Sequence, residues 1–203
     1  NNRSVECGIM DTSELIYDWN VIDYEINRNP ANHPHDLWFD DETLRDGLQS
    51  PSARNPTIEE KKELLTYMEK LGIQKVDLGL PGAGPFHREH INAMLSHIIE
   101  NDFEIRPGAA VRTLMQDIEP LVEMQENHGI SIQASAFLGT SPIRQYTEGW
   151  TMDKLISTME KAVSYAVENE VPVMFVTEDT TRSNPDDVKA IYHRAMELSL
   201  IHI

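Results

Sequence analysis

An apolar, strand-like run followed by a helical pattern recurs five times along the chain, and this alternation limits the possible folds more than any other feature. The strand-like runs begin near Leu37, Lys75, Glu104, Ser131 and Val171. Apolar residues at helical spacing follow each run and indicate a helix with one buried face. Strands that alternate with helices form a parallel sheet covered by those helices. The alternation therefore predicts an α/β fold of five strand–helix units.

The predicted helices carry recognisable start and stop signals. Thr57 and Glu60 have the spacing of a capping box at the start of the first helix, and Gly72 supplies its stop. Asn184, followed by Pro185, marks the start of the fifth helix. The apolar residues expected on the buried helix faces are Leu64, Leu65, Met68, Leu71, Ile91, Met94, Leu95, Ile98, Ile99, Ile118, Leu121, Val122, Leu155, Ile156, Met159, Ala162, Val163, Ala166, Val167, Val188, Ile191, Tyr192 and Ala195.

The alternation alone leaves two arrangements of the sheet open, a doubly wound open sheet and a (β/α)8 barrel. No GxGxxG or GxxxxGK[ST] pattern follows a strand, so the nucleotide-binding versions of the open sheet lose support. Polar side chains cluster just after the strands, as they do at the carboxyl mouth of a barrel, where barrel enzymes place their sites. The chain has 203 residues, whereas a complete barrel has about 250. We therefore expect an incomplete TIM barrel with about the first five strand–helix units.

The two ends of the chain differ from the repeating part. Residues 1–36 are polar and acidic and are expected to form an N-terminal extension, in which a short helix near Ser13–Trp19 is compatible with the pattern. Residues 37–203 are expected to form the partial barrel domain. The last six residues, Leu198–Ile203, resemble the translation of a common sequencing-adapter stretch, which leaves both a native and a non-native end open.

The composition excludes several classes of protein. The formal net charge is −17, with 34 acidic against 17 basic residues, and such a chain repels phosphate backbones, which argues against nucleic-acid binding. Cys7 is the only cysteine, so an internal disulfide and a cysteine-rich metal site are excluded. No signal-peptide pattern and no apolar stretch of about 18 residues is present. We therefore expect a cytoplasmic protein that does not enter a membrane.

The segment from Asp41 to Gln49, DETLRDGLQ, combines three acidic side chains with one arginine after the first predicted strand. A carboxylate such as that of Asp46 suits a hard divalent cation, which prefers oxygen ligands. Arg45 offers a fixed fork of donors for a carboxylate or a developing oxyanion. A solvated charged loop would have the same composition, so charge alone does not decide between the two interpretations.

The order of residues in this segment resembles the signature of the DRE-TIM metallolyases, the HMGL-like or pyruvate carboxyltransferase group. Three further segments resemble the second, fourth and fifth strand ends of its synthase branch, which includes 2-isopropylmalate synthase and homocitrate synthase. These segments are VDLGLPGAG (Val76–Gly84), SAFLGTSPIR (Ser135–Arg144) and FVTEDTTRS (Phe175–Ser183). The matches occur in the family's order, and together they span Leu37 to about Ala195.

The resemblance implies catalytic and metal-binding roles for four residues. Asp46 would ligate a divalent metal, either Mg, Mn or Zn. Arg45 would stabilise the enolate or alkoxide oxygen. Asp77 stands where the family usually has Glu, the acid that orients this arginine and a metal-bound water, and its side chain is shorter. Glu178 matches an active-site glutamate of the synthase branch.

The resemblance also implies substrate contacts. Gln49 would line the site of the 2-oxo acid. Arg112, at the end of the third predicted strand, is a candidate for binding a substrate carboxylate. Ser135 stands where many 2-isopropylmalate synthases have histidine.

The histidines and the charged run outside these motifs are expected to be structural or solvated rather than part of a site. The two metal-binding histidines of the family belong to an HxH motif near the seventh strand, after the end of this chain. The HxH that is present, His33-Pro34-His35, is assigned to the polar extension. His87 and His90 are expected at a solvated helix start, and the charged run Glu59–Glu63 on a solvated helix face.

The function implied by the resemblance is a metal-dependent, Claisen-type acyltransferase that condenses acetyl-CoA with a 2-oxo acid. The favoured product is 2-isopropylmalate, which would place the full-length protein, expected as a homodimer, in leucine biosynthesis. One alternative is an acyl-CoA lyase of the 3-hydroxy-3-methylglutaryl-CoA lyase type, towards which DGLQ rather than DGEQ leans. The other is a catalytically incomplete fragment that binds a small acid, and we expect the chain alone to be inactive.

Overall fold

The fold is described from a computed structural model, which describes residue 15, residues 38–51 and residues 53–198. The expected N-terminal helix, the HxH at His33 and His35 and the residues after Leu198 lie outside the described residues.

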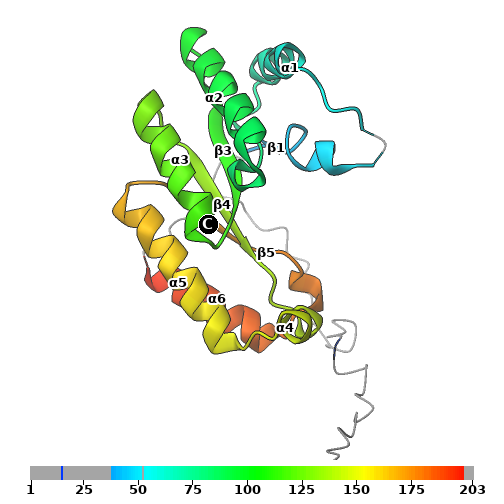
Figure 1. Cartoon of the computed structure of the whole chain (residues 1–203), viewed down its shortest axis with the longest axis vertical. Helices are drawn as coiled ribbons and strands as arrows, with labels where there is room; N and C mark the ends of the chain where they lie inside the picture. The colour runs from blue at the N-terminus through cyan, green and yellow to red at the C-terminus, as the bar shows by residue number, and fades with distance from the viewer. Residues whose placement is uncertain (1–14, 16–37, 52, 199–203) are drawn as a thin grey trace, which may run out of the picture.

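The described part of the chain forms one sheet of five parallel strands (Figure 1). The strands are β1 (Asp40–Asp41), β2 (Lys75–Asp77), β3 (Arg106–Arg112), β4 (Gln133–Leu138) and β5 (Val173–Thr177). Each strand pairs in parallel with the next one along the chain, in the order β1-β2-β3-β4-β5. A doubly wound sheet would instead reverse its strand order at a switch point. The sheet curls into part of a barrel, so the predicted incomplete TIM barrel is confirmed.

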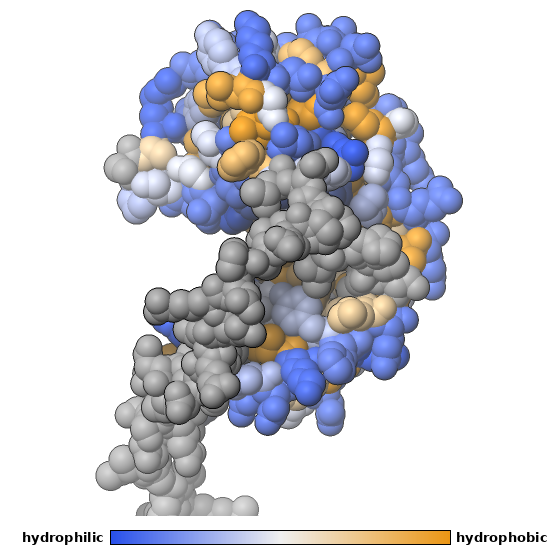
Figure 2. Space-filling model, turned by 180° about the vertical axis from the view of Figure 1, so that it is seen from behind, coloured by the Kyte–Doolittle hydropathy of each residue, from blue (hydrophilic) through white to orange (hydrophobic). Residues whose placement is uncertain are grey.

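Helices connect the strands and cover the outer side of the sheet. They are α1 (Ile58–Leu71), α2 (Pro85–Glu100), α3 (Met115–His128), α4 (Pro142–Glu148), α5 (Met152–Glu168) and α6 (Pro185–Glu197). Helix α3 packs on β3, and α5 packs on β4 and β5 (Figure 1). The short helix α4, between β4 and α5, is an addition that the helical spacing did not predict. The visible surface is largely hydrophilic around its rim, in keeping with the acidic composition (Figure 2).

The predicted helix signals have the expected geometry. Thr57 Oγ1 accepts a hydrogen bond from the Glu60 amide, and the Glu60 carboxylate accepts one from the Thr57 amide, which completes the capping box. Gly72 ends α1 with φ of 74°, in the left-handed region that favours glycine. At the start of α6, Asn184 Oδ1 accepts a hydrogen bond from the Asp186 amide at 2.9 Å.

Most residues of the predicted helix faces are buried or half-buried, but three are exposed. Leu71, Ile99 and Val167 are exposed, so their expected burial is wrong. Each lies in the last turn of its helix, where the spacing still defines a face but the sheet and the neighbouring helices no longer cover it. The prediction that the whole run Glu59–Glu63 is solvated is wrong at Lys61, which is buried.

Among the described residues, we find no helix with the length and apolar character that crossing a membrane requires.

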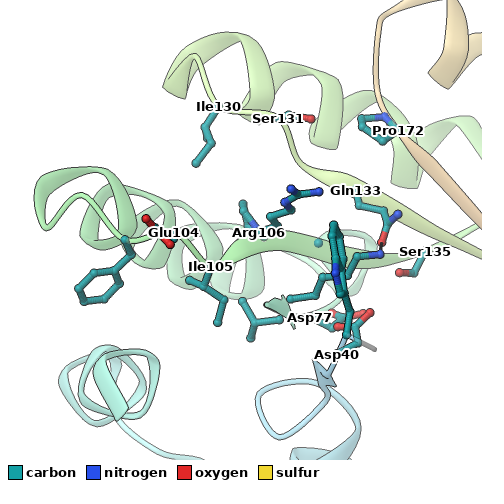
Figure 3. A pocket seen from close by; sticks show the side chains of 16 residues that line it. Asp40, Asp77, Glu104, Ile105, Arg106, Ile130, Ser131, Gln133, Ser135 and Pro172 are labelled. Atoms are coloured by element: carbon teal, nitrogen blue, oxygen red, sulfur yellow. Dashed lines mark hydrogen bonds between the residues drawn. The ribbon is translucent and has the colours of Figure 1, made fainter. Parts of the chain in front are cut away.

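A cavity of about 440 Å³ lies at the amino ends of the strands (Figure 3). Beside it the guanidinium of Arg106 stacks on Trp38, with 4.3 Å between its carbon and the ring centroid. Lys75 donates a hydrogen bond to Gln133 at 3.1 Å. In barrel enzymes this end serves stability, and chemistry takes place at the other end. The carboxyl ends of the strands are therefore the expected place of a catalytic site.

Candidate active site

A second cavity, of about 510 Å³, lies where the carboxyl ends of the strands meet. Its walls contain residues from or after all five strands. Six of the seven sequence-predicted site residues line it: Arg45, Asp46, Gln49, Asp77, Ser135 and Glu178. The parallel sheet explains this gathering, because it brings the ends of separate strands to one edge.

The strand register determines which side chains form the lower wall of this cavity. Ala110, Ser135 and Met174 are register partners across β3, β4 and β5, so their side chains form one layer on the inner face. Phe137 and Val176 lie two residues further along β4 and β5 and face the same side, because side chains alternate along a strand. Ser135 is thus the polar member of an otherwise apolar layer.

A tight turn after β1 presents the arginine of the DETLRDGLQ segment to the cavity. The carbonyl of Glu42 accepts hydrogen bonds from the amides of Arg45 at 3.2 Å and Gly47 at 3.0 Å. The 3-10 helix η3 (Asp46–Gln49) follows directly and carries Gln49 to the cavity wall.

Carboxylates surround the guanidinium of Arg45. Its Nε and Nη2 each lie 2.7 Å from Glu42 Oε2, and its Nη1 lies 3.2 Å from Asp46 Oδ1. Asp77 Oδ2 lies 3.8 Å from Nε, beyond hydrogen-bond distance. Glu42 is therefore the main partner of this arginine, a role that the sequence analysis missed. The signal available was local, since Glu42 precedes Arg45 by three residues in the same turn.

Asp77 is the buried acid of the site, with 2% of its surface exposed. Its Oδ1 accepts hydrogen bonds from the amides of Gly79 at 2.9 Å and Ala110 at 3.3 Å. Its Oδ2 is buried without a hydrogen-bond partner among the described residues. Burial raises the pKa of Asp77 to about 7, and the neighbouring charge of Glu42 adds to this effect. A carboxyl group with this pKa can gain or lose a proton near neutral pH.

The side chains of the Glu-Asp pair after β5 lie in two different environments. The Glu178 carboxylate lines the cavity and lies 4.0 Å from Arg144 of α4. Asp179 instead accepts hydrogen bonds from the amides of Thr140 at 2.8 Å and Ser141 at 3.1 Å. Burial opposes ionisation of Asp179, but these hydrogen bonds outweigh it and lower its pKa. Glu178 is therefore available to a ligand, whereas Asp179 joins the loop after β5 to the loop after β4.

Arg112 is the one predicted site residue that does not line the cavity. Its Nε and Nη2 donate to the two carboxylate oxygens of Asp117, each at 2.7 Å, and its amide donates to the same carboxylate at 3.1 Å. Asp117 is fully buried at the start of α3. The structure thus holds Arg112 in an internal ion pair, and its substrate contact stays a prediction.

The same ion pair leads to a stability prediction at Gly82. A Cβ added there would overlap the carboxylate of Asp117, which cannot move freely because Arg112 holds it from three directions. We expect Gly82→Ala to lower the free energy of unfolding by about 1–3 kcal/mol, as overpacking usually does. Urea unfolding measures this change. Gly47→Ala is the control, because its added Cβ would meet no atom closer than 3.7 Å; equal losses in both variants would contradict the prediction.

The cavity contains oxygen atoms of the kind that a divalent metal binds. Asp46 has 66% of its side chain exposed and lines the cavity, so its carboxylate fits as one oxygen ligand of a hard cation. Within the part of the chain that the structure describes, no three His, Cys, Asp or Glu side chains are arranged to hold a metal. Asp46 can therefore contribute to a metal site and would need further ligands to complete it.

Comparison with known proteins agrees with this geometry. A model of the HMGL-like family matches residues 37–203. A 2-isopropylmalate synthase of Brevibacillus brevis is 30% identical over 147 residues, 72% of this chain and 28% of that protein. The homocitrate synthase AksA of Methanocaldococcus jannaschii is 27% identical over 171 residues, 83% of this chain and 40% of that protein. A 2-isopropylmalate synthase of Campylobacter fetus is 33% identical over 161 residues, 77% of this chain and 30% of that protein.

The matched part of the chain thus spans between 28% and 40% of the length of these three relatives. The family match itself covers both the five-stranded sheet and the cavity at its carboxyl edge. The chain belongs to the HMGL-like family.

Proposed function

We propose that this chain carries the first part of the barrel of a Claisen-type acyltransferase that condenses acetyl-CoA with a 2-oxo acid. The observation that carries the proposal is the guanidinium of Arg45 at the strand ends, held by Glu42 beside the buried carboxyl of Asp77. The names of the relatives, 2-isopropylmalate synthase and homocitrate synthase, support a condensing reaction. We favour 2-isopropylmalate as the product, with the full-length protein a cytoplasmic homodimer of leucine biosynthesis.

In this proposal Arg45 stabilises oxygen atoms that gain negative charge. The condensation removes a proton from the acetyl methyl group, and the resulting enolate attacks the ketone carbon of the 2-oxo acid. The ketone oxygen then carries a negative charge, and a preorganised guanidinium lowers the energy of that state. Protonation of this oxygen and hydrolysis of the thioester by water complete the reaction and release the CoA thiol. Glu42 fixes the guanidinium by taking both Nε and Nη2, so little reorganisation is needed during the reaction.

Asp77 and Glu178 provide the proton-handling groups of the proposal. The pKa of Asp77, raised to about 7 by burial, suits a group that holds and returns a proton at Oδ2. Glu178 reaches the same cavity from β5. Gln49 and Ser135 offer an amide and a hydroxyl that can orient the 2-oxo acid, while Arg112 is retained as a more distant candidate for its carboxylate.

A divalent metal, held in part by Asp46, would supply Lewis-acid polarisation of the ketone. Since Asp46 belongs to no group of three or more metal-ligating side chains among the described residues, we propose that the 203-residue chain alone has no turnover. We also propose residues 37–203 as the barrel domain and residues 1–36 as an extension of it.

The proposal is tested by assaying a native polypeptide that contains residues 37–203 with acetyl-CoA, a divalent metal and a panel of 2-oxo acids. Release of free CoA thiol is measured. We expect release that depends on the oxo acid and is fastest with 3-methyl-2-oxobutanoate, the precursor of 2-isopropylmalate. Cleavage of 3-hydroxy-3-methylglutaryl-CoA, together with no activity on any oxo acid, would contradict the synthase and support the acyl-CoA lyase.

A further inference from the structure

A third cavity, of about 220 Å³, adjoins the candidate active site and differs from it in charge. It shares Arg45, Gln49 and Leu80 with the larger cavity, so the two lie on either side of these residues. The side chains of Lys61, His87 and His90 also line it. No acidic side chain is among its described lining residues, although the chain has twice as many acidic as basic residues.

Lys61 is the unusual member of this group. It lies on α1 with only 5% of its surface exposed. Among the described residues, none gives its ammonium group a hydrogen bond or an ion pair. Burial of most of this side chain disfavours its charged form and lowers the pKa of Lys61. An anion in the cavity would remove this cost.

The first turns of α2 add two imidazole rings to the same wall. His90 Nδ1 is buried without a hydrogen-bond partner among the described residues, so the ring has an unused polar atom beside Lys61. The pKa of His90 is lowered first by burial and then by the charge of Lys61, and only the exposed Glu89 opposes these effects. The amino end of a 16-residue helix contributes further positive potential.

We propose that this cavity, lined by Lys61, His87 and His90, binds a single oxyanion group, either a carboxylate or a phosphate. Its volume of about 220 Å³ equals that of several water molecules at about 30 Å³ each, which suits one such group. Gln49 and Asn55 line the same cavity and can donate amide hydrogens to it. We name it the oxyanion subsite.

The position of the subsite suggests where the anion comes from. Because Arg45 and Gln49 border both cavities, one ligand can place its reacting atoms in the larger cavity and an anionic end in the subsite. The phosphates of CoA are one source with this chemistry. The other is a 2-oxo acid with a second carboxylate, which would then take the place of 3-methyl-2-oxobutanoate as the substrate of the proposed reaction. Binding of the anion itself does not depend on the proposed condensation and is measured without turnover.

The test is a titration of the 203-residue chain with inorganic phosphate, followed by the ring signals of His87 and His90 in NMR spectra. We expect saturable shifts of both rings in the wild-type chain. Lys61→Met keeps the length of the side chain and removes its charge, and we expect it to weaken phosphate binding by at least about tenfold, a loss of about 1.4 kcal/mol. The thermal unfolding temperature of Lys61→Met, measured without anion, should equal or exceed that of the wild type.

Lys62→Met is the matched control, because Lys62 is the next residue of α1, pairs with Glu59 and does not line the cavity. Its dissociation constant for phosphate should lie within about twofold of the wild-type value, a much smaller change than that expected for Lys61→Met. His90→Gln gives a second variant whose lowered affinity would support the subsite independently. Equal phosphate affinity in the wild type and both lysine variants, or no saturable shift, would overturn the proposal.

Competition then identifies the source of the anion. Displacement of phosphate by 2-oxoglutarate but not by CoA supports a substrate carboxylate, and the reverse supports a CoA phosphate. Both outcomes retain the oxyanion subsite. Failure of the condensation assay with intact phosphate binding would remove the proposed function alone.

Discussion

Arg45→Lys is expected to reduce kcat/KM of the condensation by about 100- to 1000-fold, the usual effect of removing one oxyanion donor. Lysine would keep the positive charge. It would lose the planar fork through which Glu42 holds Nε and Nη2 at 2.7 Å, so the remaining donor would no longer be fixed. The assay uses a native polypeptide that contains residues 37–203, with thiol release as the measurement.

Arg54→Lys is the control for this experiment. Arg54 is also paired with a carboxylate, that of Glu60, but it is exposed in the segment before α1 and lines none of the cavities described above. Its replacement should leave kcat/KM unchanged. If Arg45→Lys retained most of the activity while circular dichroism showed an intact fold, Arg45 could not be the oxyanion donor.

Asp77→Asn is expected to stabilise the fold and to abolish activity, and the gain in stability should depend on pH. The folded pKa of Asp77 is about 7, raised by burial from 3.8. The folded state therefore binds the proton more tightly than the unfolded state, so Asp77 weakens the fold as pH rises from about 4 to about 7, and its cost is constant above that. Asparagine keeps the shape and the acceptor for the Gly79 and Ala110 amides but never ionises.

Urea unfolding of the 203-residue chain without metal measures this effect. Between pH 5 and pH 8, Asp77→Asn should gain about 3 kcal/mol relative to the wild type, from roughly two pH units at 1.36 kcal/mol each. Most of the gain should appear below pH 7. In the native polypeptide the same variant should lose activity. A stability difference that does not change with pH would mean that Asp77 ionises in the folded state at its ordinary pKa.

Features that depend on neighbours in sequence, or on the parallel strand order alone, were predictable. The capping box of Thr57 and Glu60 needs only residues three apart. The meeting of Arg45, Asp77 and Glu178 follows from a parallel sheet, which brings strand ends together whatever the details of packing.

Features that depend on distances across the fold were not predictable. The three-residue spacing brings Glu42 near Arg45, but its preference over Asp77 as the partner depends on the depth of one turn relative to the next strand. The capture of Arg112 by Asp117 depends on how α3 begins beneath β3. Lys61 sits in a charged run that is typical of a solvated face, and it is buried where α1 packs against α2 and the loops after β1 and β2.

The hydrogen bonds of Asp179 have a mechanical consequence. They clamp the amides of Thr140 and Ser141, and Ser141 caps α4, while Glu178 is the residue directly before Asp179. A ligand that pulls on Glu178 therefore also pulls on the first turn of α4. We therefore expect the loops after β4 and β5 to move together, so that a movement of Glu178 towards a substrate also displaces Arg144, which lies on that helix.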